Sequence, residues 1–152
     1  MATNHALNKL TPAEMDRFAQ CDKKRLELES SRVAPCIAAR MTAPMHSVAN
    51  MLREWEELVN AMGHDWETVD YLIDDYVYAL NVRAALGEAL NHLQSNPPKP
   101  LIEALSTLDR RFLDQTIQEN PRGAGAIEPY LMPMADRAPN WLWNRRPRVS
   151  FW

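Results

Sequence analysis

The side chains with the greatest capacity for binding lie in residues 141–152, whose sequence is WLWNRRPRVSFW. This segment holds three of the five tryptophans and three arginines, and it has no acidic residue. Trp and Arg contribute most to binding when a surface loses its water. We therefore expect the segment to dock on a surface, which belongs either to a partner or to its own domain.

Both docking modes are chemically reasonable. If the segment is extended, Trp141 and Trp143 point the same way because they are two residues apart. Arg145 and Arg146 then pair with carboxylates across the interface. We favour docking on the chain's own acidic helices, because a soluble monomer seldom exposes several large aromatic side chains. Exchange of the arm between two copies would use the same contacts and give a homodimer.

A second candidate site is a run of acids in residues 54–75. The eight acids of this run are Glu54, Glu56, Glu57, Asp65, Glu67, Asp70, Asp74 and Asp75, with no Lys or Arg among them. Residues 1–120 carry 12 Lys/Arg against 18 Asp/Glu, whereas residues 121–152 carry 5 against 2. A negative field attracts basic partners and repels phosphate. We expect a protein partner with a basic surface, and no nucleic acid.

The same acids could bind a metal. Asp70 and Asp74 share a helix face at i,i+4, and His64 lies just before that helix. Di-iron bundles, however, draw paired Glu-x-x-His motifs from their helices. Here Glu88 and His92 are spaced at i,i+4, and no second pair exists. Solvated acidic helix faces are far commoner, so we predict no metal and no cofactor.

The residues for nucleophilic catalysis lack a recognisable context. Cys21 and Cys36 form no short Cys/His pattern typical of zinc, and two cysteines do not make a disulfide framework. No Gly-x-Ser-x-Gly turn occurs. We therefore expect a protein without a catalytic role. Neither a secretion signal nor a long apolar run is visible, so we expect a cytoplasmic protein that does not bind membranes.

The elements that position these residues are predicted to be helices. The 152 residues suffice for one core, and only four glycines occur, which disfavours a fold rich in tight turns. Thr11 and Glu14 form a capping box at the start of the first helix. One helix face recurs at steps of four, three, four and three residues in Val48, Leu52, Trp55, Val59 and Met62.

The sequence thus predicts an all-α fold, a bundle of four to five amphipathic helices. We expect a disordered lead at 1–10, a helical domain at 11–120 and an irregular, Pro-rich C-terminal arm at 121–152 that packs on the bundle. The predicted helices cover 11–29, 42–63, 66–94 and 101–119, the third being either one bent helix or two with a new start at Asn81.

The preferred function is a small acidic protein-binding module of the inhibitor, immunity or adaptor type. Its predicted partner-binding residues are Glu54, Glu57, Asp70, Asp74, Trp141, Trp143, Arg145, Arg146 and Trp152. The alternative is a small-molecule-binding protein, possibly enzymatic, with a pocket between helices. That pocket would be lined by Met45, Met62, Tyr76 and Leu80.

Overall fold

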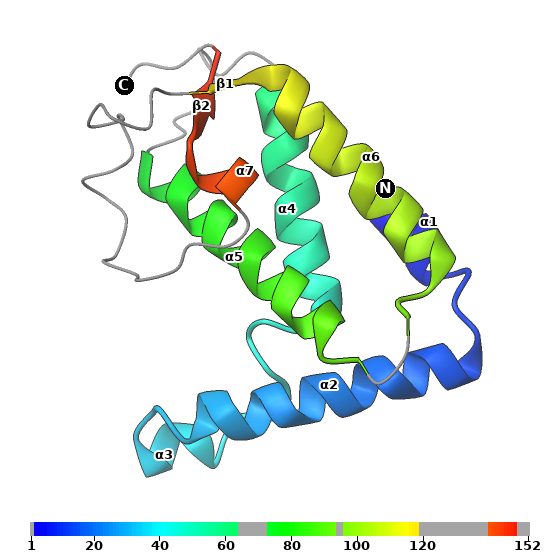
Figure 1. The fold of residues 1–152 in the computed structure, drawn as a ribbon. Helices are drawn as coiled ribbons and strands as arrows, with labels where there is room; N and C mark the ends of the chain where they lie inside the picture. The colour runs from blue at the N-terminus through cyan, green and yellow to red at the C-terminus, as the bar shows by residue number, and fades with distance from the viewer. Residues whose placement is uncertain (1, 64–72, 94–95, 119–139, 149–152) are drawn as a thin grey trace.

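The computed structural model describes residues 2–63, 73–93, 96–118 and 140–148, and these are mostly helical. The elements in chain order are α1 (Ala2–Leu7), α2 (Pro12–Ser30), α3 (Pro35–Ala38), α4 (Val48–Gly63), α5 (Ile73–Asn91), α6 (Lys99–Gln115), β1 (Thr116–Gln118), α7 (Asn140–Trp143) and β2 (Arg145–Pro147). Helices pack against helices, which confirms the predicted all-α bundle (Figure 1).

Helices α4, α5 and α6 run alongside one another and enclose the core (Figure 1). The largest side chains without measurable exposure include Trp55 of α4, Tyr76 of α5 and Phe112 of α6. The ring centroids of Trp55 and Phe112 are 4.9 Å apart at a tilt of 47°. Such tilted aromatic pairs stabilise a core beyond the area that they bury. One aromatic residue from each of these three helices therefore lies at the centre of the bundle.

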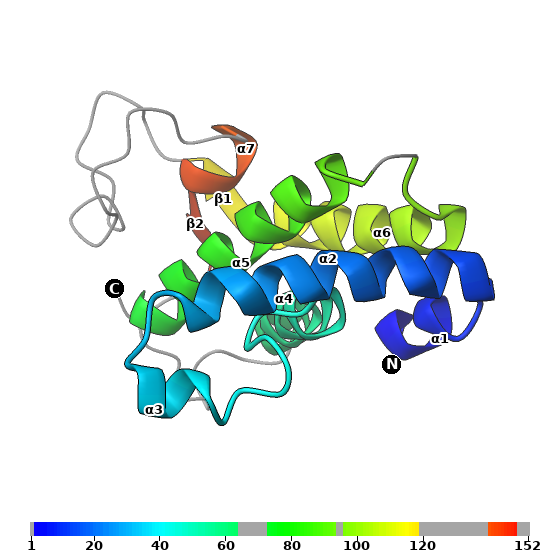
Figure 2. The ribbon, with the colours of Figure 1, turned by 90° about the horizontal axis from the view of Figure 1, so that it is seen from below.

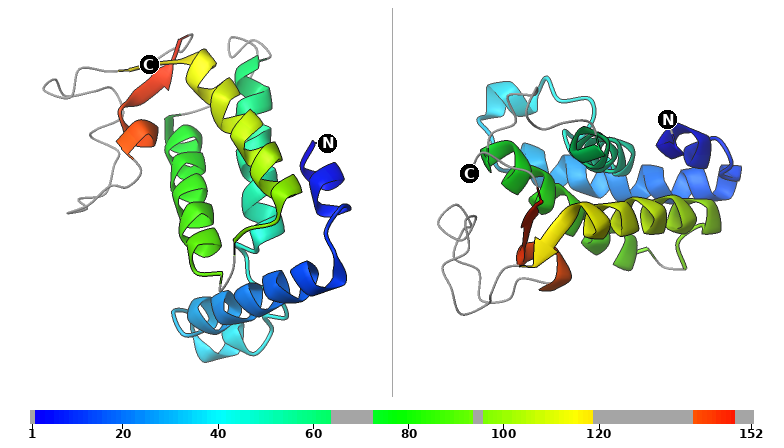
Figure 3. Two further views of the ribbon diagram at one scale, coloured as in Figure 1. Left: turned by 45° about the vertical axis from the view of Figure 1, so that its right-hand side comes forward. Right: turned by 90° about the horizontal axis from the view of Figure 1, so that it is seen from above.

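Helix α2 crosses one end of this bundle rather than joining it lengthwise (Figures 2 and 3). Phe18 is its buried residue, whereas Met15 and Leu28 are 52% and 47% exposed. Polar contacts hold the helix instead. The Asp22 carboxylate accepts a hydrogen bond from the Val48 amide at 2.9 Å, and it thus caps α4 from a different helix.

One predicted helix boundary needs correction, and one alternative that the sequence left open is decided. The second long helix was expected to start near Thr42 but starts at Val48. At this start the Ser47 hydroxyl accepts a hydrogen bond from the Asn50 backbone amide at 3.1 Å, and Asp22 of α2 caps the neighbouring Val48 amide. Of the two alternatives for residues 66–94, the described part is one helix, α5, continuous from Ile73 to Asn91, and the Asn81 side-chain amide donates to the Val77 carbonyl at 3.1 Å. Residues 66–72 and 94 of that predicted helix lie outside the described residues.

The first ten residues differ from the disordered lead expected from the sequence. Ala2–Leu7 form helix α1, which packs against α4 and α6, and Thr3 and Ala6 are buried. The carboxylate oxygens of Glu56, itself 6% exposed, accept from the Thr3 amide at 3.4 Å each. An unpaired amide at the start of a helix is a good donor to a carboxylate. The residue that stabilises the start of α1 is therefore Glu56, which is 53 residues away in the sequence, so the sequence of residues 1–10 alone does not indicate it.

We expect Glu56→Gln to lower the free energy of unfolding by about 1–2 kcal/mol at pH 7, because it removes a charge-assisted hydrogen bond to α1. Burial alone would raise the Glu56 pKa, but hydrogen bonds from Thr3 and the positively charged N-terminus together outweigh it and lower the pKa. The stabilisation is therefore present above the unfolded pKa and is lost as the pH falls through the lower folded value. Urea unfolding at pH 7 and pH 3 checks this; an equal difference at both pH values would contradict it.

The two short strands connect the C-terminal end of α6 with the C-terminal arm. β1 pairs with β2 in an antiparallel register that sets Thr116 opposite Pro147 and Gln118 opposite Arg145. This pairing fixes the arm at the C-terminal end of α6 (Figure 1). None of the described helices combines the length and the apolar character needed to span a membrane.

Candidate functional site

The described part of the C-terminal arm docks on its own chain. Arg145 donates from Nε to the Thr116 hydroxyl at 2.7 Å, and from Nη2 to the carbonyls of Leu113 at 3.2 Å and Thr116 at 3.1 Å. Arg148 donates from Nε to the Asp114 carbonyl at 2.8 Å. The last carbonyls of a helix lack partners within it. The two arginines thus bind the C-terminal end of α6, not the acids of the second and third predicted helices.

Helix α7 carries the aromatic part of this docking. Leu142 and Trp143 are buried, whereas Trp141 is half-buried with its ring against Phe112, at a centroid distance of 5.9 Å. Trp141 and Trp143 were expected to point the same way if the segment were extended; residues 140–143 form a helical turn instead, so that condition is not met. The Tyr76 hydroxyl donates to the Arg145 carbonyl at 2.8 Å and secures the segment that follows.

A buried ion pair lies beneath Trp141 and was not anticipated from the sequence. Arg83 of α5 donates from Nε to Asp109 Oδ1 at 2.9 Å and from Nη2 to Oδ2 at 2.7 Å. Trp55 Nε1 also donates to Asp109 Oδ1, at 3.0 Å. The Arg83 guanidinium lies 5.5 Å from the centre of the Trp141 ring. This arrangement links α4, α5, α6 and α7 through a bidentate pair and a cation–π contact.

A groove of about 420 Å³ opens beside this ion pair, between α5 and α6. Arg83 and Trp141 border it, together with Gly87 and Leu105. It is not the pocket that the sequence suggested. Among the residues expected there, Met45 is 71% exposed and the other three, Met62, Tyr76 and Leu80, are packed in the core.

Three of the four acidic residues predicted to bind a partner are described, and they lie on α4 and α5. Glu57 and Asp74 are exposed, and Glu54 is half-buried. Tyr78, which the sequence analysis did not single out, contacts Glu54, and its pKa is raised by burial and by hydrogen bonding to that carboxylate. Helices α4 and α5 pack together and run antiparallel (Figure 1). Asp74 precedes Tyr78 by about one turn of α5, and Glu57 follows Glu54 by about one turn of α4, so helical spacing places them on adjoining faces of the two helices. Two further predicted residues, Asp70 and Trp152, lie outside the described residues.

Cys21 and His92 border a second groove, of about 400 Å³, between α2 and α5. Burial raises the pKa of the Cys21 thiol, and the neighbouring Asp22 raises it further. A thiol with a raised pKa is a poor nucleophile at neutral pH. Within the described ranges, no group of three or more His, Cys, Asp or Glu is arranged to hold a metal ion.

Comparison of the chain with protein-family models, with curated proteins and with solved structures found no match. The function must therefore be argued from the geometry of the surfaces described above.

Proposed function

We propose that this protein is a protein-binding module of the inhibitor, immunity or adaptor type, without a catalytic role. Its contact surface is the acidic α4–α5 face, defined as Glu54, Glu57, Asp74 and Tyr78. The partner carries a basic surface, and the encounter takes place in the cytoplasm. Nucleic acid and anionic membranes are poor partners because this face would repel their phosphates.

The observation that carries the proposal is the placing of carboxylates around an exposed aromatic ring. Tyr78 is 46% exposed, and Glu54, Glu57 and Asp74 make no ion pair with any other residue that the structure describes. Tyrosine is enriched among the residues that dominate binding energy, and unpaired charges around it steer a partner of opposite sign. On this face, Tyr78 would thus contribute binding affinity, and the surrounding carboxylates would raise the rate of association.

The apolar surface next to this face extends the anchor. The rings of Tyr78 and His46 have centroids 6.1 Å apart, and Met45, adjacent to His46, is 71% exposed. Methionine adapts its shape to different contacts. The arm contributes less than the sequence suggested, because Trp143, Arg145 and Arg148 already bind their own chain. Exchange of the arm between two copies therefore ranks below the α4–α5 face as an interaction.

The charge reversal Glu57→Lys/Asp74→Lys tests the proposal. We expect it to slow association with the partner at least tenfold at low ionic strength, and to flatten the salt dependence of the rate. Tyr78→Ala should instead speed dissociation. The partner is first isolated from the native host on the immobilised wild-type chain, and its rate constants are then measured by surface plasmon resonance.

The matched control is Glu103→Lys/Asp114→Lys on α6. Both of these residues are exposed, and the change in net charge is the same, but the surface is different. The control should leave the association rate within about threefold of wild type at moderate salt, because screening limits the reach of a charge to about 10 Å. Equal slowing by both double variants would show that net charge matters and the α4–α5 face does not.

A further inference from the structure

Arg83 has a hydrogen-bonding group that its ion pair leaves unused. A guanidinium carries five N–H donors, and those of Nε and Nη2 face Asp109. Nη1 has no hydrogen-bond partner among the described residues, although Arg83 is only 9% exposed. Nη1 is not among the buried polar atoms that lack a partner, so it is open to the groove that Arg83 lines. It can therefore donate a hydrogen bond to a molecule bound there.

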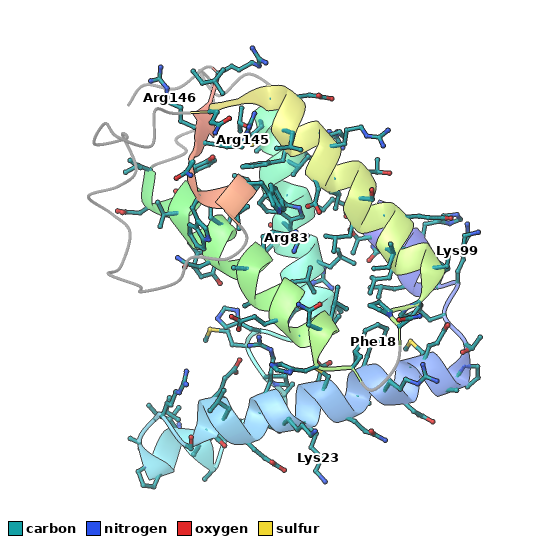
Figure 4. The ribbon with its side chains drawn as sticks, in the orientation of Figure 1. Phe18, Lys23, Arg83, Lys99, Arg145 and Arg146 are labelled. Atoms are coloured by element: carbon teal, nitrogen blue, oxygen red, sulfur yellow. The ribbon has the colours of Figure 1, made fainter. Side chains whose placement is uncertain are left out.

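The position of Nη1 places it in the α5–α6 groove. A Cβ atom added to Gly87 would stand 3.3 Å from Nη1, so the nitrogen lies against the bare backbone of that glycine. Arg83 and Gly87 both line the groove, and Trp141 forms a wall of it. Figure 4 shows Arg83 in the middle of the bundle, beside α5. The absence of a side chain at Gly87 keeps the approach to Nη1 open.

The other groups around the groove define the chemistry of an occupant. Ile102 and Leu105 of α6 are apolar, and the Trp141 ring offers a flat face. Asp109 already neutralises the guanidinium, and the carboxylate of Glu88 lies on the same groove. An anionic ligand would therefore be repelled by these two carboxylates, and the Arg83 guanidinium would not offset the repulsion because Asp109 already neutralises it. A neutral oxygen acceptor satisfies Nη1 without that penalty.

We propose that the α5–α6 groove binds an uncharged, flat aromatic or heteroaromatic molecule whose carbonyl oxygen accepts a hydrogen bond from Arg83 Nη1. The ring packs between Trp141 and the apolar side chains of α6. A volume of about 420 Å³ is within the usual range for small-molecule sites. This site is separate from the acidic α4–α5 face, and the two proposals can fail independently.

The first test uses quinolin-2(1H)-one, a flat lactam, as the probe. It is titrated into the ¹⁵N-labelled full chain while the indole N–H signal of Trp141 is followed by NMR. We expect a saturable shift of that signal. Quinoline, which lacks the carbonyl, should bind about tenfold more weakly, since a hydrogen bond to a charged group is lost. 2-Naphthoate should also bind more weakly than the lactam.

Gly87→Leu is the decisive variant, because its side chain fills the groove next to Nη1. We expect it to weaken lactam binding at least tenfold. Ser106→Leu introduces the same side chain at an exposed position of α6 that does not line the groove, and it should leave binding unchanged. Gly87→Ala adds a single methyl group and favours the helix, so it should weaken binding about threefold without lowering Tm.

Several results would overturn the proposal. These are no shift of the Trp141 signal at millimolar lactam, equal affinity for quinoline, tighter binding of 2-naphthoate, or unchanged binding in Gly87→Ala and Gly87→Leu. If Gly87→Leu fails to fold, Gly87→Ala alone decides the role of the space beside Nη1.

Discussion

Asp109→Ala should lower the free energy of unfolding by about 3–5 kcal/mol, because it leaves a buried guanidinium without its counter-ion. The side chains of Arg83 and Asp109 are 10% and 21% exposed, so water compensates little. The substitution also removes the acceptor of Trp55 Nε1. The Asp109 carboxylate thus pairs with Arg83 of α5 and accepts a hydrogen bond from Trp55 of α4, so the substitution removes both contacts.

A double-mutant cycle separates the ion pair from these other losses. Arg83→Met removes the cation, but Asp109 still accepts the hydrogen bond from Trp55 Nε1. The free energy of unfolding should therefore fall less than in Asp109→Ala. Arg83→Met/Asp109→Leu should recover most of the loss, since apolar residues often replace a buried pair at little cost. Urea unfolding followed by far-UV circular dichroism gives each value. A loss below about 1 kcal/mol for Asp109→Ala would show that the pair is solvated.

The helices could be predicted because their signals are local. The face that begins at Val48 recurs with the helical period, and its members are buried from Val48 to Met62. The capping box of Thr11 and Glu14 is present with both hydrogen bonds, and α2 starts at Pro12. These features depend on residues three or four positions apart, which a sequence displays directly.

The candidate sites depend on contacts across long sequence separations. Arg83 and Asp109 are 26 residues apart, and Asp109 and Trp55 are 54 apart, so neither spacing indicates a pair. Helix α1 was missed for the same reason, because Glu56 lies 53 residues beyond its partner Thr3. Charge density drew attention to the acids of residues 54–75, but an exposed Tyr78 beside Glu54 becomes visible only when α4 and α5 are placed together.

Trp143→Ala should destabilise the protein by about 3–5 kcal/mol, the usual cost of removing a buried aromatic side chain. Trp143 is 5% exposed and belongs to the core cluster, so the arm contributes to the fold of the bundle. Trp143→Phe is the matched variant. It keeps an aromatic ring and removes the buried Nε1–H, which has no hydrogen-bond partner among the described residues. We expect Trp143→Phe to lower the free energy of unfolding by less than about 1.5 kcal/mol.

Amide hydrogen exchange shows whether the loss lies in the arm or in the whole bundle. The Arg148 amide donates to the Gln115 carbonyl at 3.0 Å, so its exchange rate reports the docking of β2 on the end of α6. In Trp143→Ala this amide should exchange at least a hundredfold faster, as expected when a contact of several kcal/mol is lost, whereas in Trp143→Phe it should change less than about tenfold. Unchanged exchange in the Ala variant, with wild-type stability, would mean that hydrogen bonds from Arg145 and Arg148 hold the arm without the buried ring. Because these side-chain hydrogen bonds lie at the C-terminal end of α6 and bury little apolar surface, we expect the ring to be required.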